Sequence, residues 1–325
     1  RLIKDKRVND QYSKEKEYIE LGARILRFEF GPQKYLRKEL LWPFLDELIN
    51  KLSEFYEKPE NKPDWIHAHY ADAGYVGVRL SKNLKIPLVF TAHSLGREKK
   101  RRLLDAGLTQ SQIEKIYCIS KRISAEEESL KEASMIVTST KQESVYQYST
   151  YKSFQSKKAK VIFPGVDYNK FHHIHSTTET SDIDNMMNPF LTDSFKPPLL
   201  AISRAVRRKN VPSLVEAFGR SEKLKKSNNL ILVLGCRDNL SKMDSQQKDV
   251  FQQIFEIIDK YNLYGKVAYP KKHTPDQIPS IYRWAASRRG IFVNPALTEP
   301  FGLTLLEAAS CGLPMVATND GGPQE

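Results

Sequence analysis

Short apolar runs alternate with longer segments of mixed character along most of this chain. Each run is about as long as a buried strand, and the runs fall at residues 65–70, 87–92, 135–138, 160–163, 199–202, 230–234, 267–269, 291–293 and 315–317. The segments between them are rich in helix formers, and we predict helices near residues 44–56, 71–84, 110–132, 212–225, 246–262, 275–287 and 303–310. This alternation of apolar runs and helices predicts parallel sheets wrapped by helices, an α/β fold. In addition, residues 26–30 alternate between apolar and charged side chains, which predicts a strand there.

The alternation stops between residues 168 and 196, where Ser, Thr, Asn, Asp and His cluster without a period. We therefore predict an N-terminal domain of residues 1–167, a linker of residues 168–196 and a C-terminal domain of residues 197–325. A chain of 325 residues is long enough for two domains of ordinary size. Two doubly wound domains joined by one linker imply a cleft, with ligands at the C-terminal ends of the strands.

The charge balance narrows the class of partner. A formal net charge of +12 favours anions, which include nucleic acid, membrane surfaces and phosphorylated small molecules. The basic runs at 97–102 and 204–209 are not interleaved with aromatic residues, so we expect no nucleic-acid binding. No apolar run approaches the ~18 residues of a membrane span, so we expect no membrane partner. Three scattered cysteines favour a cytoplasmic location over a disulfide framework. Nothing in the pattern indicates an oligomeric state.

Two acids in the last predicted strand–loop–helix unit frame a candidate anion site. Glu299 lies in the loop and Glu307 lies eight residues later in the helix. The backbone N–H groups of Gly302, Leu303 and Thr304 would start that helix, where the dipole attracts anions. Flanking carboxylates would accept hydrogen bonds from sugar hydroxyls. A plain surface loop followed by a solvent-facing helix explains the same spacing equally well.

Several motifs together resemble one enzyme family. The sequence EPFGLTLLEA at 299–308 is similar to the E-x7-E motif of retaining GT-B glycosyltransferases. With VAYPK at 267–271 and NPA at 294–296, the chain resembles the sucrose-phosphate synthases, in the sucrose synthase and sucrose-phosphate synthase group. The resemblance implies a GT-B fold, in which two Rossmann-like domains face each other across a cleft. The family's Gly-rich acceptor loop and closing helix have no counterpart, so we expect a fragment lacking both ends.

The resemblance implies an enzyme of sucrose biosynthesis that moves glucose from UDP-glucose to fructose 6-phosphate, with retention and without a metal or other cofactor. Arg204 and Lys209 match the family's phosphate-binding pair and, with the helix start at Gly302, would hold the diphosphate. From the residues alone, this basic run is either a diphosphate clamp or a solvated turn. Glu307 would bind the ribose and Glu299 the glucose. Arg204, Lys209 and Glu299 would thus form part of the catalytic set.

The residues expected to bind the acceptor are identified from motif matches in the first half of the chain. His93 lies in TAHSLGR at 91–97, which resembles the family's TGHSLGR, and would complete the catalytic set by contacting a glucose hydroxyl. Lys121 and Arg122 begin KRISAEE, which resembles RRIxAEE. With Lys38 and Lys99 they would bind the phosphate of fructose 6-phosphate. Lys121 replaces an Arg, which keeps the charge but loses the bidentate geometry.

Other readings stay open at this point. His67 and His69 share one face of a predicted strand and could chelate a metal, but no further ligand stands at a suitable spacing, so we expect none. The motif HYADAG at 69–74 resembles the family's acceptor side, where it would place His69 and Asp72. The rival functions are a sucrose synthase, another retaining nucleotide-sugar glycosyltransferase, and a non-catalytic nucleotide-sugar-binding regulatory protein.

Overall fold

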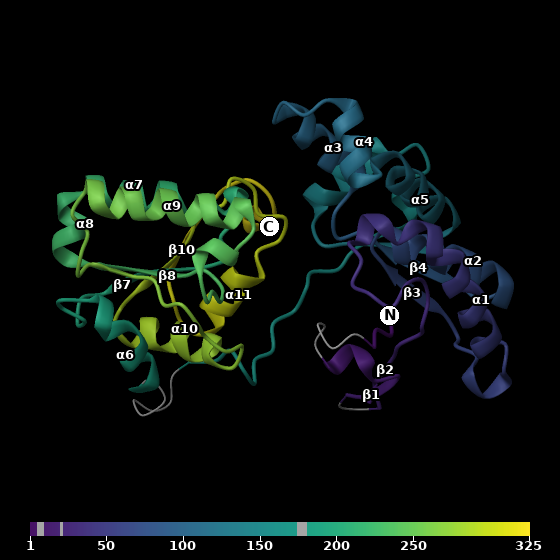
Figure 1. Cartoon of the computed structure of the whole chain (residues 1–325), viewed down its shortest axis with the longest axis horizontal. Coiled ribbons are helices and arrows are strands. Elements are labelled where there is room, and N and C mark those ends of the chain that lie inside the picture. Colours follow the sequence, from purple (N-terminus) through teal and green to yellow (C-terminus); the bar gives the residue numbers. More distant parts are fainter. Residues whose placement is uncertain (5–9, 20–21, 174–180) are drawn as a thin grey trace. The chain divides into compact units, whose positions relative to one another are not determined.

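The chain forms two compact units, Arg1–Phe163 and Pro164–Glu325. The computed structural model describes residues 1–4, 10–19, 22–173 and 181–325. Each unit has its own parallel sheet with helices around it (Figure 1), as the alternation in the sequence predicted. Among the described residues, no helix is long and apolar enough to cross a membrane.

The N-terminal unit is built on a four-stranded parallel sheet of order β3-β4-β5-β6. Its strands are β3 (Ile66–His69), β4 (Leu88–Thr91), β5 (Met135–Thr138) and β6 (Ala159–Val161). Its α-helices are α1 (Leu45–Tyr56), α2 (Ala71–Leu84), α3 (Gly96–Asp105), α4 (Gln110–Tyr117) and α5 (Ile119–Glu132). Helix α2 packs between α1 and α5. The approach is close at Gly74, where a Cβ would lie 2.4 Å from the Ser129 hydroxyl and 2.8 Å from the Phe90 ring.

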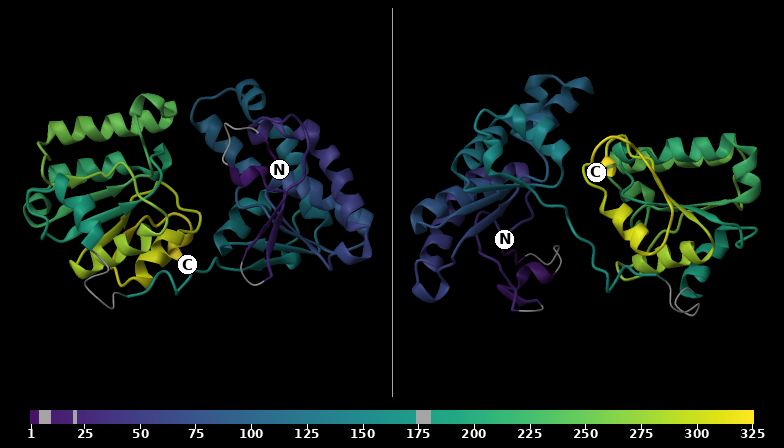
Figure 2. Two further views of the ribbon diagram at one scale, coloured as in Figure 1. Left: turned by 60° about the horizontal axis from the view of Figure 1, so that its bottom comes forward. Right: turned by 180° about the vertical axis from the view of Figure 1, so that it is seen from behind.

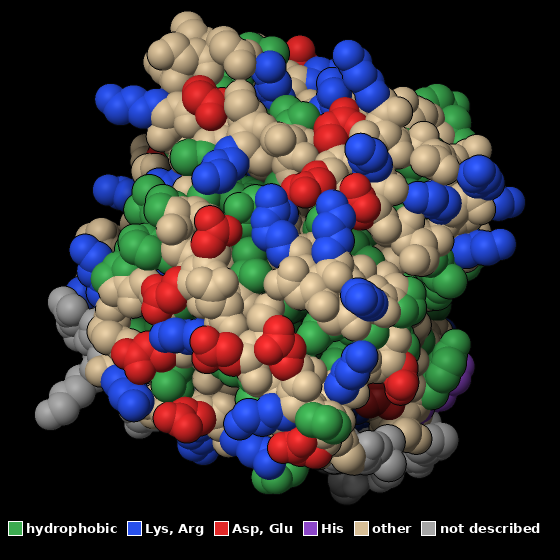
Figure 3. All heavy atoms as spheres, turned by 90° about the vertical axis from the view of Figure 1, so that its right-hand side faces the viewer, with side chains coloured by type: hydrophobic (Ala, Val, Ile, Leu, Met, Phe, Trp, Pro, Cys, Tyr) green, Lys and Arg blue, Asp and Glu red, His purple; other side chains and the backbone are tan. Residues whose placement is uncertain are grey.

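Two sequence expectations in this unit differ from the structure. The predicted helix over 110–132 is two helices, because Cys118 adopts the left-handed conformation, with φ of 46°. The strand expected at 26–30 lies slightly earlier, as β2 (Arg24–Leu26) in an antiparallel hairpin with β1 (Lys16–Tyr18). On the face of this unit seen in Figure 3, Lys and Arg are interspersed with Asp and Glu rather than gathered in one basic surface.

The C-terminal unit contains a five-stranded parallel sheet of order β11-β10-β7-β8-β9. Its strands are β7 (Pro198–Ile202), β8 (Asn229–Val233), β9 (Val267–Ala268), β10 (Ile291–Asn294) and β11 (Met315–Ala317). Its α-helices are α6 (Ser181–Met187), α7 (Val211–Arg220), α8 (Glu222–Ser227), α9 (Ser245–Lys260), α10 (Gln277–Ser287) and α11 (Leu303–Ser310). Helices cover both faces of this sheet (Figures 1 and 2).

The sheet separates two cores. On one face Leu200, Ile231 and Phe292 pack against α6, α10 and α11, and on the other Leu230 and Leu232 pack against α7 and α9. Residues of β8 thus alternate between the two cores, and all five are buried, which explains why the four residues after Asn229 form a continuous apolar run.

Part of the segment expected to be an irregular linker is folded. Residues 181–187 form α6, whose Ile183 and Met187 are buried in the core. The Trp284 indole N–H donates to Asp184 over 2.9 Å and ties α6 to α10. These two buried residues give too short a pattern to predict a helix. Residues 174–180 of the expected linker lie outside the described part of the chain, and the proposed domain limits stay a prediction.

Candidate active site

The loop after β10 brings Glu299 together with Lys209. The Lys209 ammonium donates to the Glu299 carboxylate, and the Asn294 side-chain amide donates to the same oxygen over 3.0 Å. Glu299 is only 6 % exposed, so its charge needs these partners. Its backbone N–H donates to the Asp320 carbonyl over 3.1 Å, and its carbonyl accepts from the Gly322 N–H over 2.9 Å. Glu299 is therefore held by its backbone as well as its side chain.

The sheet order explains this meeting of residues 90 positions apart. Lys209 follows β7 and Glu299 follows β10, and these strands are neighbours in the sheet. The chain adds β8 and β9 on one side of β7 and then returns to place β10 on its other side. This is the switch point at which doubly wound sheets bind ligands. The Leu297 N–H also donates to the Arg208 carbonyl over 3.0 Å, which joins the two loops directly.

Gly302 begins α11 beside Glu299. It is the N-cap residue with φ of 95°, a conformation that favours glycine. A Cβ there would lie 2.9 Å from Leu305 and 3.3 Å from Glu299 Cγ, so glycine is needed for space as well. The N–H groups of Leu303 and Thr304 open the helix, where no intrahelical acceptor exists for them. A buried acid, a lysine and a helix start thus stand together at one sheet edge.

The remaining predicted donor residues lie in different surroundings. Glu307 is half-buried on α11 and accepts a hydrogen bond from the Tyr282 hydroxyl over 3.0 Å. Burial raises the pKa of Glu307 above its usual value, and the Tyr282 hydrogen bond only partly opposes this. Glu307 therefore does not face open solvent, in contrast to the alternative in which the helix would be an ordinary surface helix. Arg204 is exposed two residues after β7, and Ala205 beside it is fully buried and anchors the turn.

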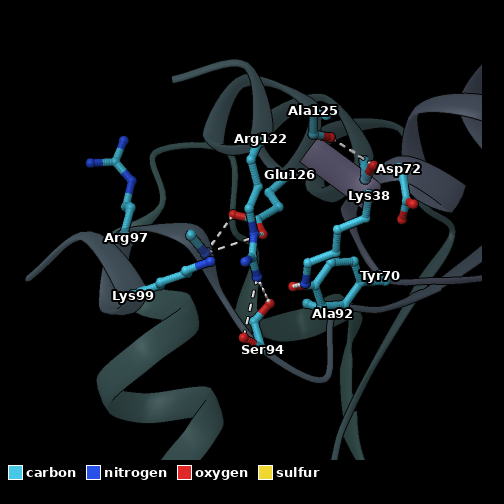
Figure 4. Close-up of polar contacts among 12 residues, drawn as sticks. Lys38, Tyr70, Asp72, Ala92, Ser94, Arg97, Lys99, Arg122, Ala125 and Glu126 are labelled. Carbon is cyan, nitrogen blue, oxygen red and sulfur yellow. Dashed lines mark hydrogen bonds and ion pairs between the residues drawn. The ribbon is translucent and has the colours of Figure 1, made fainter. Parts of the chain in front are cut away.

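Three of the four predicted acceptor residues line one pocket in the N-terminal unit. Lys38 comes from the 3-10 turn η2 (Lys38–Leu40), Lys99 from the first turn of α3, and Arg122 from α5 (Figure 4). The pocket is open to solvent and has an empty volume of about 290 Å³, the space open to solvent included. Its other lining residues are Glu39, Trp42, Tyr70, Ala71, Asp72 and Tyr117. Lys121, the fourth, is exposed and is not among the lining residues.

The cations of the pocket act on one another, although Glu39 and Asp72 line it too. Burial, and then the charges of Lys38 and Arg122, lower the pKa of Lys99 to about 8, while Glu39 opposes this effect. The nearest oxygen of Glu39 is 3.9 Å from the Lys99 ammonium. The Lys99 ammonium also lies 3.7 Å from the centre of the Tyr117 ring, a cation–π contact. An anion entering this pocket would relieve the repulsion among the three cations.

Tyr70 contacts two of these cations, and sequence reasoning missed it. The Lys38 ammonium donates to its hydroxyl, and the Arg122 guanidinium carbon lies 4.6 Å from its ring centre. Tyr70 has φ of 79° and ψ of 164°, a region almost confined to glycine. The sequence could have drawn attention to Tyr70 only because it directly follows β3, and many residues without a function also follow a strand. The aromatic walls Trp42 and Tyr117 carried no signal of their own.

His93 follows β4 and has φ of 56°. Its Nε2 lies 2.7 Å from Nδ1 of His69, and the two rings stack with centres 5.0 Å apart. Burial and then His69 lower the pKa of His93. His67 is held separately, with Nε2 2.8 Å from the Thr91 hydroxyl. Among the described residues, no group of three or more His, Cys, Asp or Glu side chains is arranged to hold a metal ion.

Comparisons with known proteins decide the family. Residues 1–179 match the family model described as sucrose synthase first GT-B domain, and residues 182–325 match glycosyl transferases group 1. The chain belongs to the sucrose synthase family of GT-B proteins. Sucrose-phosphate synthase 4 of Arabidopsis thaliana is 39 % identical to this chain over 355 residues. The sucrose-phosphate synthase of Spinacia oleracea is 38 % identical to it over 368 residues. These alignments cover 93 % and 97 % of the chain and 34 % of each relative.

The chain therefore spans about a third of the length of the curated relatives it matches. Among solved structures, a sucrose-phosphate synthase from Thermosynechococcus elongatus matches with a TM-score of 0.74 at 23 % identity, over 96 % of this chain and 69 % of that one. Anabaena HepE in complex with UDP-glucose matches with a TM-score of 0.63 at 19 % identity, over 88 % and 66 %. These likenesses confirm the predicted GT-B fold.

Proposed function

We propose that this chain carries the substrate-binding residues of a sucrose-phosphate synthase, which transfers glucose from UDP-glucose to fructose 6-phosphate and gives sucrose 6-phosphate. Relatives at about 40 % identity carry that name. The observation that carries the proposal is the pocket of the N-terminal unit, where Lys38, Lys99 and Arg122 meet aromatic walls. Cations suit a phosphate, and aromatic rings suit the apolar face of a sugar.

The phosphate of fructose 6-phosphate would bind between Lys38, Lys99 and Arg122. Lys99 is the central ligand in this proposal, because it lies in the first turn of α3 and has two cationic neighbours that an anion would screen. Lys38 would reach the phosphate from the opposite wall while its side chain rests on Tyr70. Arg122 is only 5 % exposed, so it would contribute mainly as a nearby charge. We assign Lys121 no contact with the acceptor.

The donor would bind on the C-terminal unit. Arg204, Lys209 and the start of α11 at Gly302 would hold the diphosphate and neutralise the charge that develops as it leaves. Two cations placed in this way supply the stabilisation that a bound metal ion gives in other transferases, so we propose a metal-independent reaction. Glu299 would accept hydrogen bonds from the glucose hydroxyls and Glu307 from the ribose.

Retention in this proposal needs no protein nucleophile. The leaving phosphate oxygen would take the proton of the acceptor hydroxyl as the new glycosidic bond forms on the same face. His93 would orient the glucose through a hydroxyl contact. The depressed pKa of His93 suits this role, because a neutral imidazole can either donate or accept a hydrogen bond.

A product assay tests the proposal. The purified protein is incubated with UDP-glucose and either fructose 6-phosphate or fructose, and the product is identified together with its anomeric configuration. Sucrose 6-phosphate formed with retention, also in the presence of a chelator, is the expected result. Turnover with fructose alone would indicate a sucrose synthase instead. Binding of UDP-glucose without turnover of either acceptor would indicate a regulatory protein and refute the enzyme assignment.

A further inference from the structure

Beneath the acceptor pocket lies a carboxylate to which no role has been given. Glu126, on α5, is fully buried. Its Oε1 accepts from Arg122 Nε over 2.9 Å and from the Gly96 backbone N–H over 3.1 Å. Its Oε2 accepts from the same N–H over 2.9 Å and from the Tyr151 hydroxyl. One side chain therefore joins α5, the start of α3 and the segment after β5.

The same group controls the turn between β4 and α3. Arg122, held by Glu126, donates through Nη2 to the carbonyl and the hydroxyl of Ser94, the latter over 3.2 Å (Figure 4). Gly96 is the first residue of α3, and Lys99 stands three residues further along that helix. Both the orientation of Arg122 and the starting point of the helix that carries Lys99 thus depend on Glu126.

Glu126 packs closely against Gly96. A Cβ on Gly96 would lie 2.8 Å from Glu126 Oε2 and 2.9 Å from Ile123, so glycine is required for the carboxylate to reach the helix start. Burial and then Glu126 raise the pKa of Tyr151, which keeps its hydroxyl protonated as a donor. The buried negative charge is balanced by Arg122 and by the positive end of α3.

We propose that Glu126 is a positioning residue for the acceptor phosphate: it fixes Arg122 and the start of α3, and so places two of the three cations of the pocket. This inference rests on the proposed function, since it concerns binding of fructose 6-phosphate. It excludes a direct contact with the substrate, because Glu126 has no exposed surface. It also predicts that removing the charge of Glu126 weakens the binding of the acceptor phosphate, whereas simple electrostatics predicts tighter binding.

The variant Glu126→Gln separates the two effects. It keeps the shape but removes one negative charge from beneath a cationic pocket, and by charge alone this would tighten the binding of an anion. If Glu126 acts by positioning, binding weakens instead, because an amide cannot accept from all three donors at once. We expect the KM for fructose 6-phosphate to rise roughly tenfold, within the range for residues coupled in one network, with the KM for UDP-glucose unchanged.

Two further variants distinguish a loss of positioning from a general loss of stability. Tyr151→Phe keeps the charge of Glu126 and removes one donor, so it should raise the acceptor KM in the same direction by a smaller factor. Glu143→Gln is the matched control, because Glu143 is also a buried acid of this unit, 8 % exposed, and accepts from the Ser139 N–H over 2.7 Å. It should leave both KM values unchanged.

Calorimetric titration with fructose 6-phosphate gives a readout that does not depend on turnover. The wild type is measured first: no binding and no turnover would refute the proposed function, not the role of Glu126. If the wild type binds and Glu126→Gln binds equally well or more tightly, the positioning role is wrong. It is also wrong if the KM values of donor and acceptor rise by the same factor, since that indicates a general loss of structure.

Discussion

The titration of Lys99 gives the sharpest prediction for the acceptor pocket. Burial and the charges of Lys38 and Arg122 lower its pKa from 10.5 to about 8. This fall corresponds to roughly 3 kcal/mol by which the surroundings disfavour the ammonium. Because the pKa is depressed, Lys99 is charged below pH 8 and loses its proton as the pH rises through this value. A phosphate bound beside it would favour the charged form again.

Binding of fructose 6-phosphate should therefore weaken above pH 8. If only the charged form of Lys99 binds the phosphate, the apparent Kd is twice its plateau value at a pH equal to the pKa of about 8, and roughly ten times the plateau value one pH unit higher. Below about pH 6 the phosphate itself takes up a proton, so binding weakens there for a separate reason. The expected profile has a plateau between these two limits.

Calorimetric titration with fructose 6-phosphate between pH 6 and 9.5, at constant ionic strength, measures this profile. Lys99→Arg provides the control, because a guanidinium stays charged throughout and its profile should be flat above pH 8. Lys99→Met should bind fructose 6-phosphate weakly at every pH. It should also unfold at a higher temperature, because it removes a half-buried cation that lies close to Lys38 and Arg122. A wild-type Kd that stays constant up to pH 9.5, or the same decline in Lys99→Arg, would refute the reasoning.

Three further changes test other parts of the molecule. Gly302→Ala should lower the free energy of unfolding by about 1–2 kcal/mol, through its left-handed backbone, and weaken UDP binding; thermal denaturation and titration with UDP measure these effects. Glu299→Gln should raise the KM for UDP-glucose about tenfold or more, because the neutral amide accepts more weakly from the glucose hydroxyls and no longer holds the Lys209 ammonium in place, whereas Asp249→Asn, at an exposed ion pair, should not. Tyr70→Gly should be more stable than Tyr70→Ala by about 1–2 kcal/mol; equal unfolding temperatures would contradict the strain at this residue.

Much of the fold could be predicted from the spacing of apolar residues. The buried strands were found because a parallel strand covered on both faces is apolar along most of its length, and β8, with four apolar residues after Asn229, is the clearest case. The break at Cys118 could not be predicted, because no glycine or proline marks it and a left-handed cysteine is unusual. Helix α6 was missed because its buried side chains Ile183 and Met187 give too short a pattern to indicate a helix.

The candidate site could be predicted only in part. The family motifs drew attention to Lys38, Lys99 and Arg122, and the structure places all three around one pocket. The pairing of Lys209 with Glu299 depends on which strands are neighbours, and this order is not visible in a single sequence. The role proposed for Glu126 depends on its burial and on three donors from separate elements, and a run of three glutamates in a helix gives no indication of either.

The order of strands around β7 has a consequence for how this unit tolerates change. Lys209 and Glu299 lie in the loops that follow two adjacent strands, but the chain between them includes all of β8 and β9. The separation along the chain is long, while the separation in space is set locally by the pairing of β7 with β10. Insertions in the surface loops after β8 or β9 should therefore lengthen the chain without moving this ion pair, so the far edge of the sheet is free to vary while the donor side is preserved.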